Sequence, residues 1–109
     1  TNGSPLWQNY LDREGSLDDV ATSVAVSGDG SKVFAVGYTN TTAGGYAFSV
    51  RAYNATNGTL LWQDHLDMEG SLADVAKSVA VMDNSNIFVV GYTRTTAGGL
   101  AFSVRAHRQ

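Results

Sequence analysis

The chain contains no cysteine, a single proline and only seven lysine and arginine residues. Without cysteine it can form no disulfide, no catalytic thiolate and no cysteine-ligated metal site. The net charge is −3 and the basic residues are scattered, so no stripe is present to neutralise phosphates, and nucleic acid is not an expected partner. No apolar run approaches the roughly 20 residues that a membrane-spanning helix needs, so a membrane is not expected either. The compartment stays open, with an extracellular or cell-surface location favoured.

The chain does contain a long internal repeat. The segment Thr1–Val26 returns as Thr56–Val81, and Val33–Tyr53 returns as Ile87–His107. The period of roughly 54 residues is typical of propellers and other arrays, in which a single unit cannot bury its own apolar surface. Two such units are fewer than an array needs, so we expect the chain to be completed by further copies of itself.

Each copy contains segments with the alternation and composition of β-strands, separated by turn residues, and no 3.6-residue period persists long enough for a helix. The fold class is therefore expected to be all-β. Repeat 1 covers residues 1–55 and repeat 2 covers residues 56–109. The expected strands are Asp19–Ser27, Lys32–Thr39, Tyr46–Tyr53 and Thr59–Leu66, with counterparts at Asp74–Met82, Asn86–Thr93, Ala101–His107 and Ser4–Leu11.

Apolar residues lie on both sides of three of these strands, which is typical of sheets that are covered on both faces. Four-stranded antiparallel sheets of this kind, repeated in one chain, are typical of β-propeller blades. We therefore expect two blades with the strand order 4-1-2-3-4-1-2-3. The alternation predicts three shared faces, formed by Val20, Thr22, Val24 and Val26, by Phe34, Val36 and Tyr38, and by Val33, Ala35 and Gly37.

The motif Asp-Val-Ala-x-Ser-Val-Ala-Val, followed by a Gly/Asp/Asn turn and Val/Ile-Phe-x-Val-Gly-Tyr-Thr, resembles the bacterial β-propeller repeat called SBBP. The Thr-Asn-Gly-x-x-Leu-Trp hairpin is similar to the blade-closing turn of quinoprotein-like (PQQ-type) propellers. That resemblance implies that Trp7 and Trp62 dock one blade against the next. Quinoprotein dehydrogenases hold their cofactor with a calcium site, a stacking tryptophan and often a vicinal disulfide. This chain has no cysteine and no further tryptophan, so neither a cofactor nor enzymatic activity is expected.

Two of the expected strands lack a partner in the chain. Ser4–Leu11 is a fourth strand with no third strand before it, and Ala101–His107 is a third strand with no fourth strand after it. An exposed sheet edge readily pairs with another chain. We therefore expect strand exchange between copies, and Trp7 bonded back within its own subunit to seal a compact solitary body would contradict this. The residues expected to pair are Leu6, Trp7 and Gln8 of one copy with Phe102, Val104 and Ala106 of the next.

This head-to-tail contact must either close into a ring or grow as a filament. A ring of two-blade chains has an even number of blades. A tetramer with eight blades is favoured over a trimer with six, because quinoprotein-like propellers usually have eight.

Polar residues also recur at matching positions of the two copies. Arg51 and Arg105 fall on third strands and are expected to form a salt bridge or an inter-blade hydrogen bond. The carboxylates in the connectors could surround a channel mouth and hold a cation such as calcium. Because no compact ligand spacing is present, they are interpreted as solvated loop charges and no metal site is predicted. These carboxylates are Asp12, Glu14, Asp67 and Glu69.

Two functions follow from the sequence. The first is a non-enzymatic, self-assembling propeller module with a structural or protein-interaction role. The alternative is a lectin-like or other ligand-binding propeller with one weak site per blade, near the repeated TTAGG segment and the aromatic residues Tyr38 and Tyr92. A carbohydrate or protein ligand is left open.

Overall fold

The computed structural model describes residues 3–8, 19–40, 46–66, 73–82, 86–94 and 99–109. Over these residues the protein is all-β, as predicted, and no helix has the length and apolarity needed to cross a membrane. The strands begin and end within one residue of the seven expected segments outside the N-terminal one. They are β1 (Asp19–Val26), β2 (Lys32–Asn40), β3 (Tyr46–Asn54), β4 (Leu60–Leu66), β5 (Ala73–Met82), β6 (Asn86–Arg94) and β7 (Leu100–Arg108).

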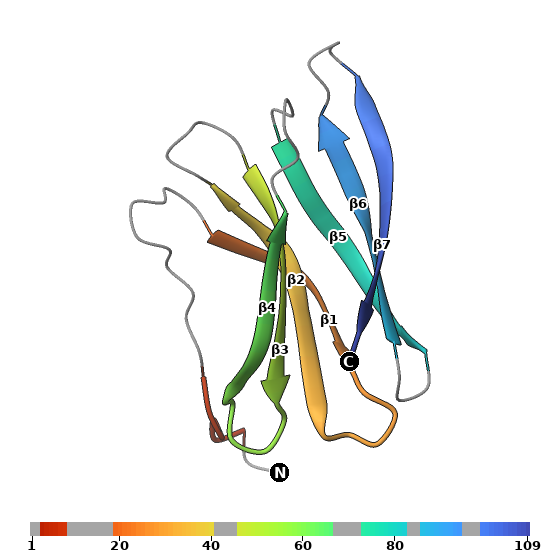
Figure 1. Ribbon diagram of the computed structural model, residues 1–109. Helices are drawn as coiled ribbons and strands as arrows, with labels where there is room; N and C mark the ends of the chain where they lie inside the picture. The colour runs from red at the N-terminus through yellow and green to blue at the C-terminus, as the bar shows by residue number, and fades with distance from the viewer. Residues whose placement is uncertain (1–2, 9–18, 41–45, 67–72, 83–85, 95–98) are drawn as a thin grey trace.

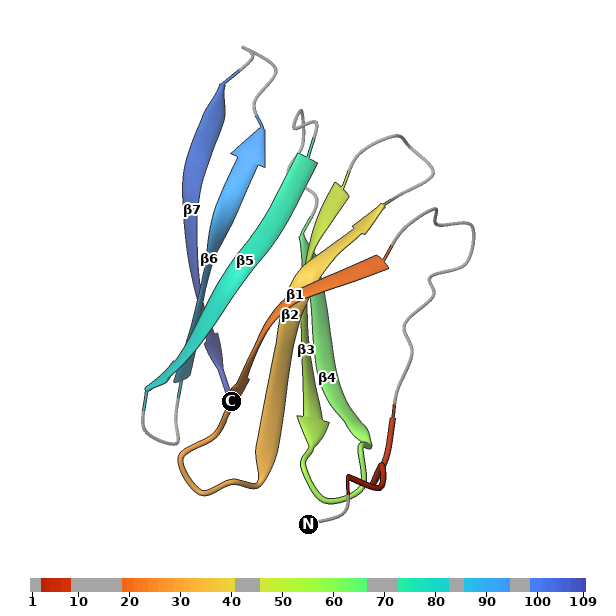
Figure 2. The same ribbon diagram turned by 180° about the vertical axis from the view of Figure 1, so that it is seen from behind.

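The strands form two antiparallel sheets, with β1 to β4 in the first and β5 to β7 in the second (Figures 1 and 2). One parallel pairing, between Tyr46 and Ala73, joins β3 to β5. Residues 3–8 are the described part of the expected strand Ser4–Leu11, and they form no strand. A strand needs a ladder of backbone pairing, and the ladders of the described strands include no residue of this segment.

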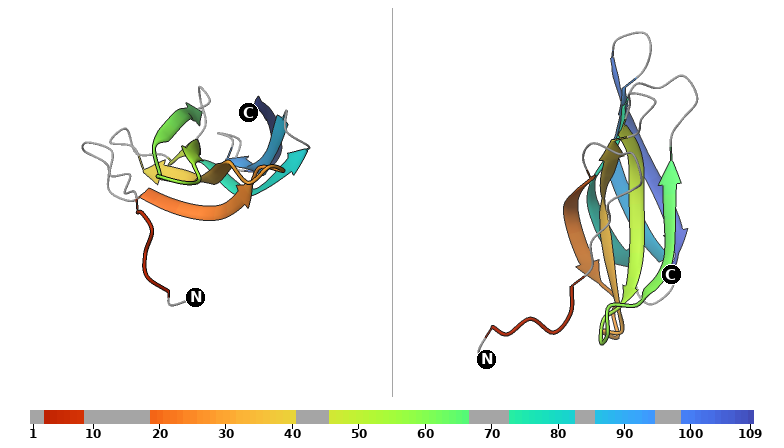
Figure 3. Two further views of the ribbon diagram at one scale, coloured as in Figure 1. Left: turned by 90° about the horizontal axis from the view of Figure 1, so that it is seen from below. Right: turned by 90° about the vertical axis from the view of Figure 1, so that its left-hand side faces the viewer.

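The core lies between the two sheets, which stand side by side in Figure 1 and one behind the other in the right view of Figure 3. Each sheet contributes one face, and every second residue along a strand points into the contact. This pattern confirms the predicted alternation at Phe34 and Val36. The cluster consists of Phe34, Val36, Phe48, Val50 and Ala52 from the first sheet, and Ala76, Ile87 and Val89 from the second, with Trp62, Val79 and Val81 packed against it.

The prediction that Val20, Thr22, Val24 and Val26 share one face is wrong. Val20 pairs with Tyr38 but Val24 pairs with Ala35, because the register shifts between Ala21 and Ser23. A β-bulge of this kind inserts one extra residue and reverses the alternation beyond it. The strand β5 has the same shift between Ala76 and Ser78.

Each bulge is matched by a glycine on the neighbouring strand. A Cβ atom at Gly37 would collide with the carbonyl oxygen of Val20, and one at Gly91 would collide with that of Val75. The bulged backbone approaches so closely that only hydrogen fits there. The glycine in each Val-Gly-Tyr-Thr segment is thus required by the bulge opposite it.

The variants Gly37→Ala and Gly91→Ala should each lower the free energy of unfolding by about 1–3 kcal/mol, the usual cost of forcing extra atoms into a packed site. Urea denaturation followed by circular dichroism measures this loss. Gly99→Ala is the matched control, since a Cβ atom there meets nothing within 4 Å. Equal stability of all three variants would contradict the assignment.

Candidate functional site

The two sheets are built from the same repeat. Each residue in the contact between them can therefore be compared with the residue at the same position of the other copy. We call two residues repeat mates when they occupy the same position in the two copies. Phe48 on β3 packs against the second sheet and is 1% exposed, whereas its repeat mate Phe102 on β7 is 85% exposed. The two phenylalanines differ in what covers them.

The same relation holds across a whole face of the second sheet. Its residues correspond to those with which the first sheet covers β5 and β6, but no described segment lies over them. Contiguous apolar surface of this kind is uncommon on a soluble monomer and marks an interaction site. We call it the exposed face of the second sheet. Phe102, Val104 and Ala106 on this face are exposed, and Phe88 and Val90 are half-buried.

The side of the first sheet that faces away from the second sheet corresponds to the side of the second sheet that is buried in the core. Its residues are repeat mates of Ala76, Val79, Val81, Ile87 and Val89, which pack in the core. A groove of about 290 Å³ lies on this side, between the sheet and Trp7. We call this surface the groove face of the first sheet, and it consists of Ala21, Val24, Val26, Val33 and Ala35.

Both tryptophans make the same contact in their own copy of the repeat. The Trp62 indole Nε1–H donates to the carbonyl oxygen of Gln109 at 3.0 Å, and Trp7 Nε1–H donates to that of Ala55 at 2.9 Å. Ala55 and Gln109 are repeat mates. Trp62 belongs to β4 of the first sheet and thus bonds to the end of the second. Trp7 lies against the end of the first sheet in the position that a preceding fourth strand would give it.

Each tryptophan also lies on an aromatic residue of the following sheet. Trp62 stacks on His107 with ring centroids 5.8 Å apart, and Trp7 lies against Tyr53 at 6.0 Å. Trp7 also covers Gly58, whose φ of 76° suits glycine.

Trp7 is therefore hydrogen-bonded within its own chain, but the N-terminal segment does not seal the molecule. Leu6 is 91% exposed, and the right view of Figure 3 shows the backbone of residues 3–8 outside both sheets, although the Trp7 side chain contacts the first sheet. Gln8 is exposed as well. The edge of β7 and the exposed face of the second sheet carry no described segment.

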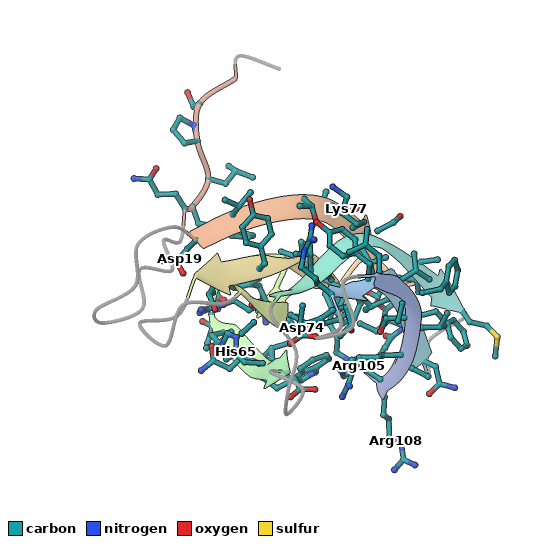
Figure 4. The ribbon with its side chains drawn as sticks, turned by 90° about the horizontal axis from the view of Figure 1, so that it is seen from above. Asp19, His65, Asp74, Lys77, Arg105 and Arg108 are labelled. Carbon is teal, nitrogen blue, oxygen red and sulfur yellow. The ribbon has the colours of Figure 1, made fainter. Side chains whose placement is uncertain are left out.

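A polar cluster lies beside Trp62. Asp64 Oδ2 is 2.9 Å from His107 Nε2 and 3.6 Å from Arg105 Nη2. The guanidinium of Arg105 also lies 6.0 Å from the centre of the Phe48 ring, while Arg108 on the same strand points away from the sheets (Figure 4). The salt bridge predicted for Arg105 is thus present, with a carboxylate that the sequence interpretation did not single out.

Arg51, the repeat mate of Arg105, has a different environment. It is 9% exposed, lines the groove, and lies 5.5 Å from the centre of the Tyr53 ring. Its Nε atom is buried without a hydrogen-bond partner, as is the Nε atom of Arg105, and Asp19 lines the same groove. Asp64 corresponds in the sequence to Asn9, which lies outside the described residues.

The connector carboxylates Asp12, Glu14, Asp67 and Glu69 also lie outside the described residues. In the part of the chain that is described, no group of three or more histidine, cysteine, aspartate or glutamate side chains could hold a metal ion.

Comparison of the chain with protein-family models, with curated proteins and with solved structures finds no match.

The Trp62→Phe variant should lose about 1 kcal/mol or more of folding free energy, because the indole hydrogen bond and part of the packing between the two sheets are removed. Trp7→Phe is the matched control. Its segment contacts one sheet only, so it should cost less in the dissociated chain. Denaturation at low protein concentration, followed by far-ultraviolet circular dichroism, gives both values. A larger loss for Trp7→Phe would contradict this interpretation.

Proposed function

We propose that the chain is a non-enzymatic β-propeller repeat module that assembles head to tail with copies of itself. The four strands of the first sheet form one blade, and β5 to β7 form a second blade that lacks its outer strand. The observation that carries the proposal is the match between the two open surfaces. The exposed face of the second sheet and the groove face of the first sheet are the repeat mates of the two surfaces that already pack together inside the chain.

The internal contact joins unlike faces, with Phe48 and Val50 of the first sheet against Ile87 and Val89 of the second. By the same pairing, Phe102 and Val104 of one copy would cover Val33 and Ala35 of the next. Such a contact leaves one open face of each kind at the two ends of any linear assembly. It is driven by the removal of apolar surface from water.

Strand exchange would complete the second blade. In the first sheet, Ala52 lies opposite Trp62 and Phe48 lies opposite Leu66. The same register on β7 places Ala106 opposite Trp7 of the neighbouring copy. Trp7 would stay on the first sheet of its own chain while the backbone beside it pairs with the neighbour, because β4 likewise pairs with β3 while Trp62 bonds to the second sheet.

Repetition of this contact around an axis closes a ring when the blade angle divides a full turn. Four chains give eight blades and three give six, both within the range of known propellers. The tetramer is preferred on the resemblance to quinoprotein-like propellers. The ring would act as a structural or protein-interaction scaffold.

The lectin-like alternative remains a prediction from the sequence. Its supporting features are the TTAGG segment, which falls almost wholly outside the described residues, and the nearby Tyr38 and Tyr92, of which Tyr38 lines the groove.

Two complementary variants test the proposal. Phe102→Asp places a charge on the exposed face of the second sheet, and Val24→Asp places one on the groove face, where Val24 is 63% exposed. Each variant alone should be monomeric at the 11.5 kDa chain mass, because a buried unpaired charge opposes the contact. A mixture of the two should form a dimer through the one intact contact. Sedimentation velocity measures all three samples.

The unmodified chain should sediment at four times the chain mass, or three times for the smaller ring. A chain that stays monomeric at every accessible concentration would overturn the proposal. A symmetric contact between like faces would also contradict it, and it is distinguishable because mixing the two variants would then restore nothing.

A further inference from the structure

The groove on the first sheet corresponds to a space that is filled inside the chain. Val33 and Ala35 line the groove, and their repeat mates Ile87 and Val89 are fully buried in the core. Trp7 lines the groove as well, and its repeat mate Trp62 packs against the same core. The side chains that fill the internal space therefore indicate which chemical group fits the groove.

Two phenylalanine rings of the first sheet fill the internal space. Phe34 lies against Trp62, with ring centroids 6.2 Å apart, and the centre of the Phe48 ring lies 6.0 Å from the guanidinium carbon of Arg105. Aromatic rings are stabilised by tilted contacts with other rings and by a guanidinium over the ring face. The repeat thus forms a site that holds aromatic rings.

The groove has the same kinds of group in place. The ring centroids of Trp7 and Tyr53 lie 6.0 Å apart, and the guanidinium carbon of Arg51 lies 5.5 Å from the centre of the Tyr53 ring. The volume of about 290 Å³ is near the lower end of the range for small-molecule sites. Asp19 and Arg51, which both line the groove, carry opposite charges, so the lining selects neither an anion nor a cation.

We propose that the groove is a binding site for a small neutral molecule with a single aromatic ring. The ring lies between the apolar wall of Val33 and Ala35 and the indole of Trp7, as the phenylalanines do in the internal contact. Removal of apolar surface from water drives binding. The contacts with the indole and with the guanidinium of Arg51 select an aromatic ring over a saturated ring of similar size.

Binding also bears on assembly, and this part rests on the proposed function. The contact proposed between copies brings Phe88 and Phe102, the repeat mates of the two phenylalanines in the internal contact, to Trp7 and Arg51 of the next copy. The small molecule and the second copy therefore compete for the groove, and the ligand lowers the assembled fraction.

Benzyl alcohol is a suitable probe, because it carries the side-chain group of phenylalanine, and cyclohexylmethanol is its saturated counterpart. The Phe102→Asp variant keeps the groove open, and Phe102 is exposed enough for the substitution to leave the fold intact. Titration followed by the nuclear magnetic resonance signal of the Ala35 backbone amide should show saturable binding of benzyl alcohol. Cyclohexylmethanol should bind about fivefold more weakly, because it lacks the aromatic contacts. Equal binding of the two alcohols, or shifts confined to β7, would overturn the proposal.

Variants of two neighbouring residues locate the site. In the Phe102→Asp background, Trp7→Leu keeps an apolar side chain but removes the indole, and should weaken binding of benzyl alcohol about fivefold. Leu6→Ala changes an exposed residue outside the groove and should leave binding unchanged. Equal affinity of the Trp7→Leu variant and its parent would refute the assignment. Should that variant not fold, the comparison of the two alcohols still decides.

Sedimentation of the unmodified chain separates this inference from the proposed function. Benzyl alcohol should shift the assembly toward monomer, and cyclohexylmethanol should do so less at the same concentration. Assembly that is insensitive to benzyl alcohol, in a protein whose Phe102→Asp variant binds it, would contradict the competition. A chain that never assembles would refute the proposed function, while the titration would still confirm or refute the binding site.

Discussion

A sheet with two apolar faces must be covered on both sides. In this chain one face of each sheet is covered by the other sheet, and the remaining faces decide what the molecule can contact. One contact is complete, between the first sheet and the second. The two faces that remain are chemically the two halves of that same contact. Since burial of apolar surface is non-directional, it supplies the driving force but not the geometry. The geometry comes from the repeat, which positions the same side chains at the same intervals in both sheets.

The positions of the strands were predictable because their signals are local. Alternation of apolar and polar residues and the glycine-rich turns mark each of the seven strands to within one residue. The bulges in β1 and β5 could not be predicted from the sequence, because one extra residue at Thr22 or Lys77 leaves the composition of the strand unchanged. The signal that could have found them is in the next strand, where Gly37 and Gly91 interrupt otherwise β-branched and aromatic segments.

The candidate site was only partly predictable for a related reason. The repeated Leu-Trp pair pointed to Trp7 and Trp62, and both tryptophans occupy equivalent positions in the structure. The cluster of Asp64, Arg105 and His107 joins β4 to β7, two strands that are distant in sequence and belong to different sheets. No spacing rule connects such residues. Their pairing becomes visible only when the sheets are packed.

The small sequence differences between the two copies matter because they fall in the contact between the sheets and in the groove. The internal contact has an aspartate, an arginine and a histidine together, whereas the groove has Arg51 and Tyr53 at the matching positions. Asp64 is 42% exposed, so its ion pair with Arg105 adds a modest stabilisation and the apolar contact remains the main one. The difference still makes the two contacts unequal. The contact inside the chain is tethered and includes the ion pair of Asp64 with Arg105, whereas the groove face is an open apolar surface. A contact between copies would therefore be the weaker of the two.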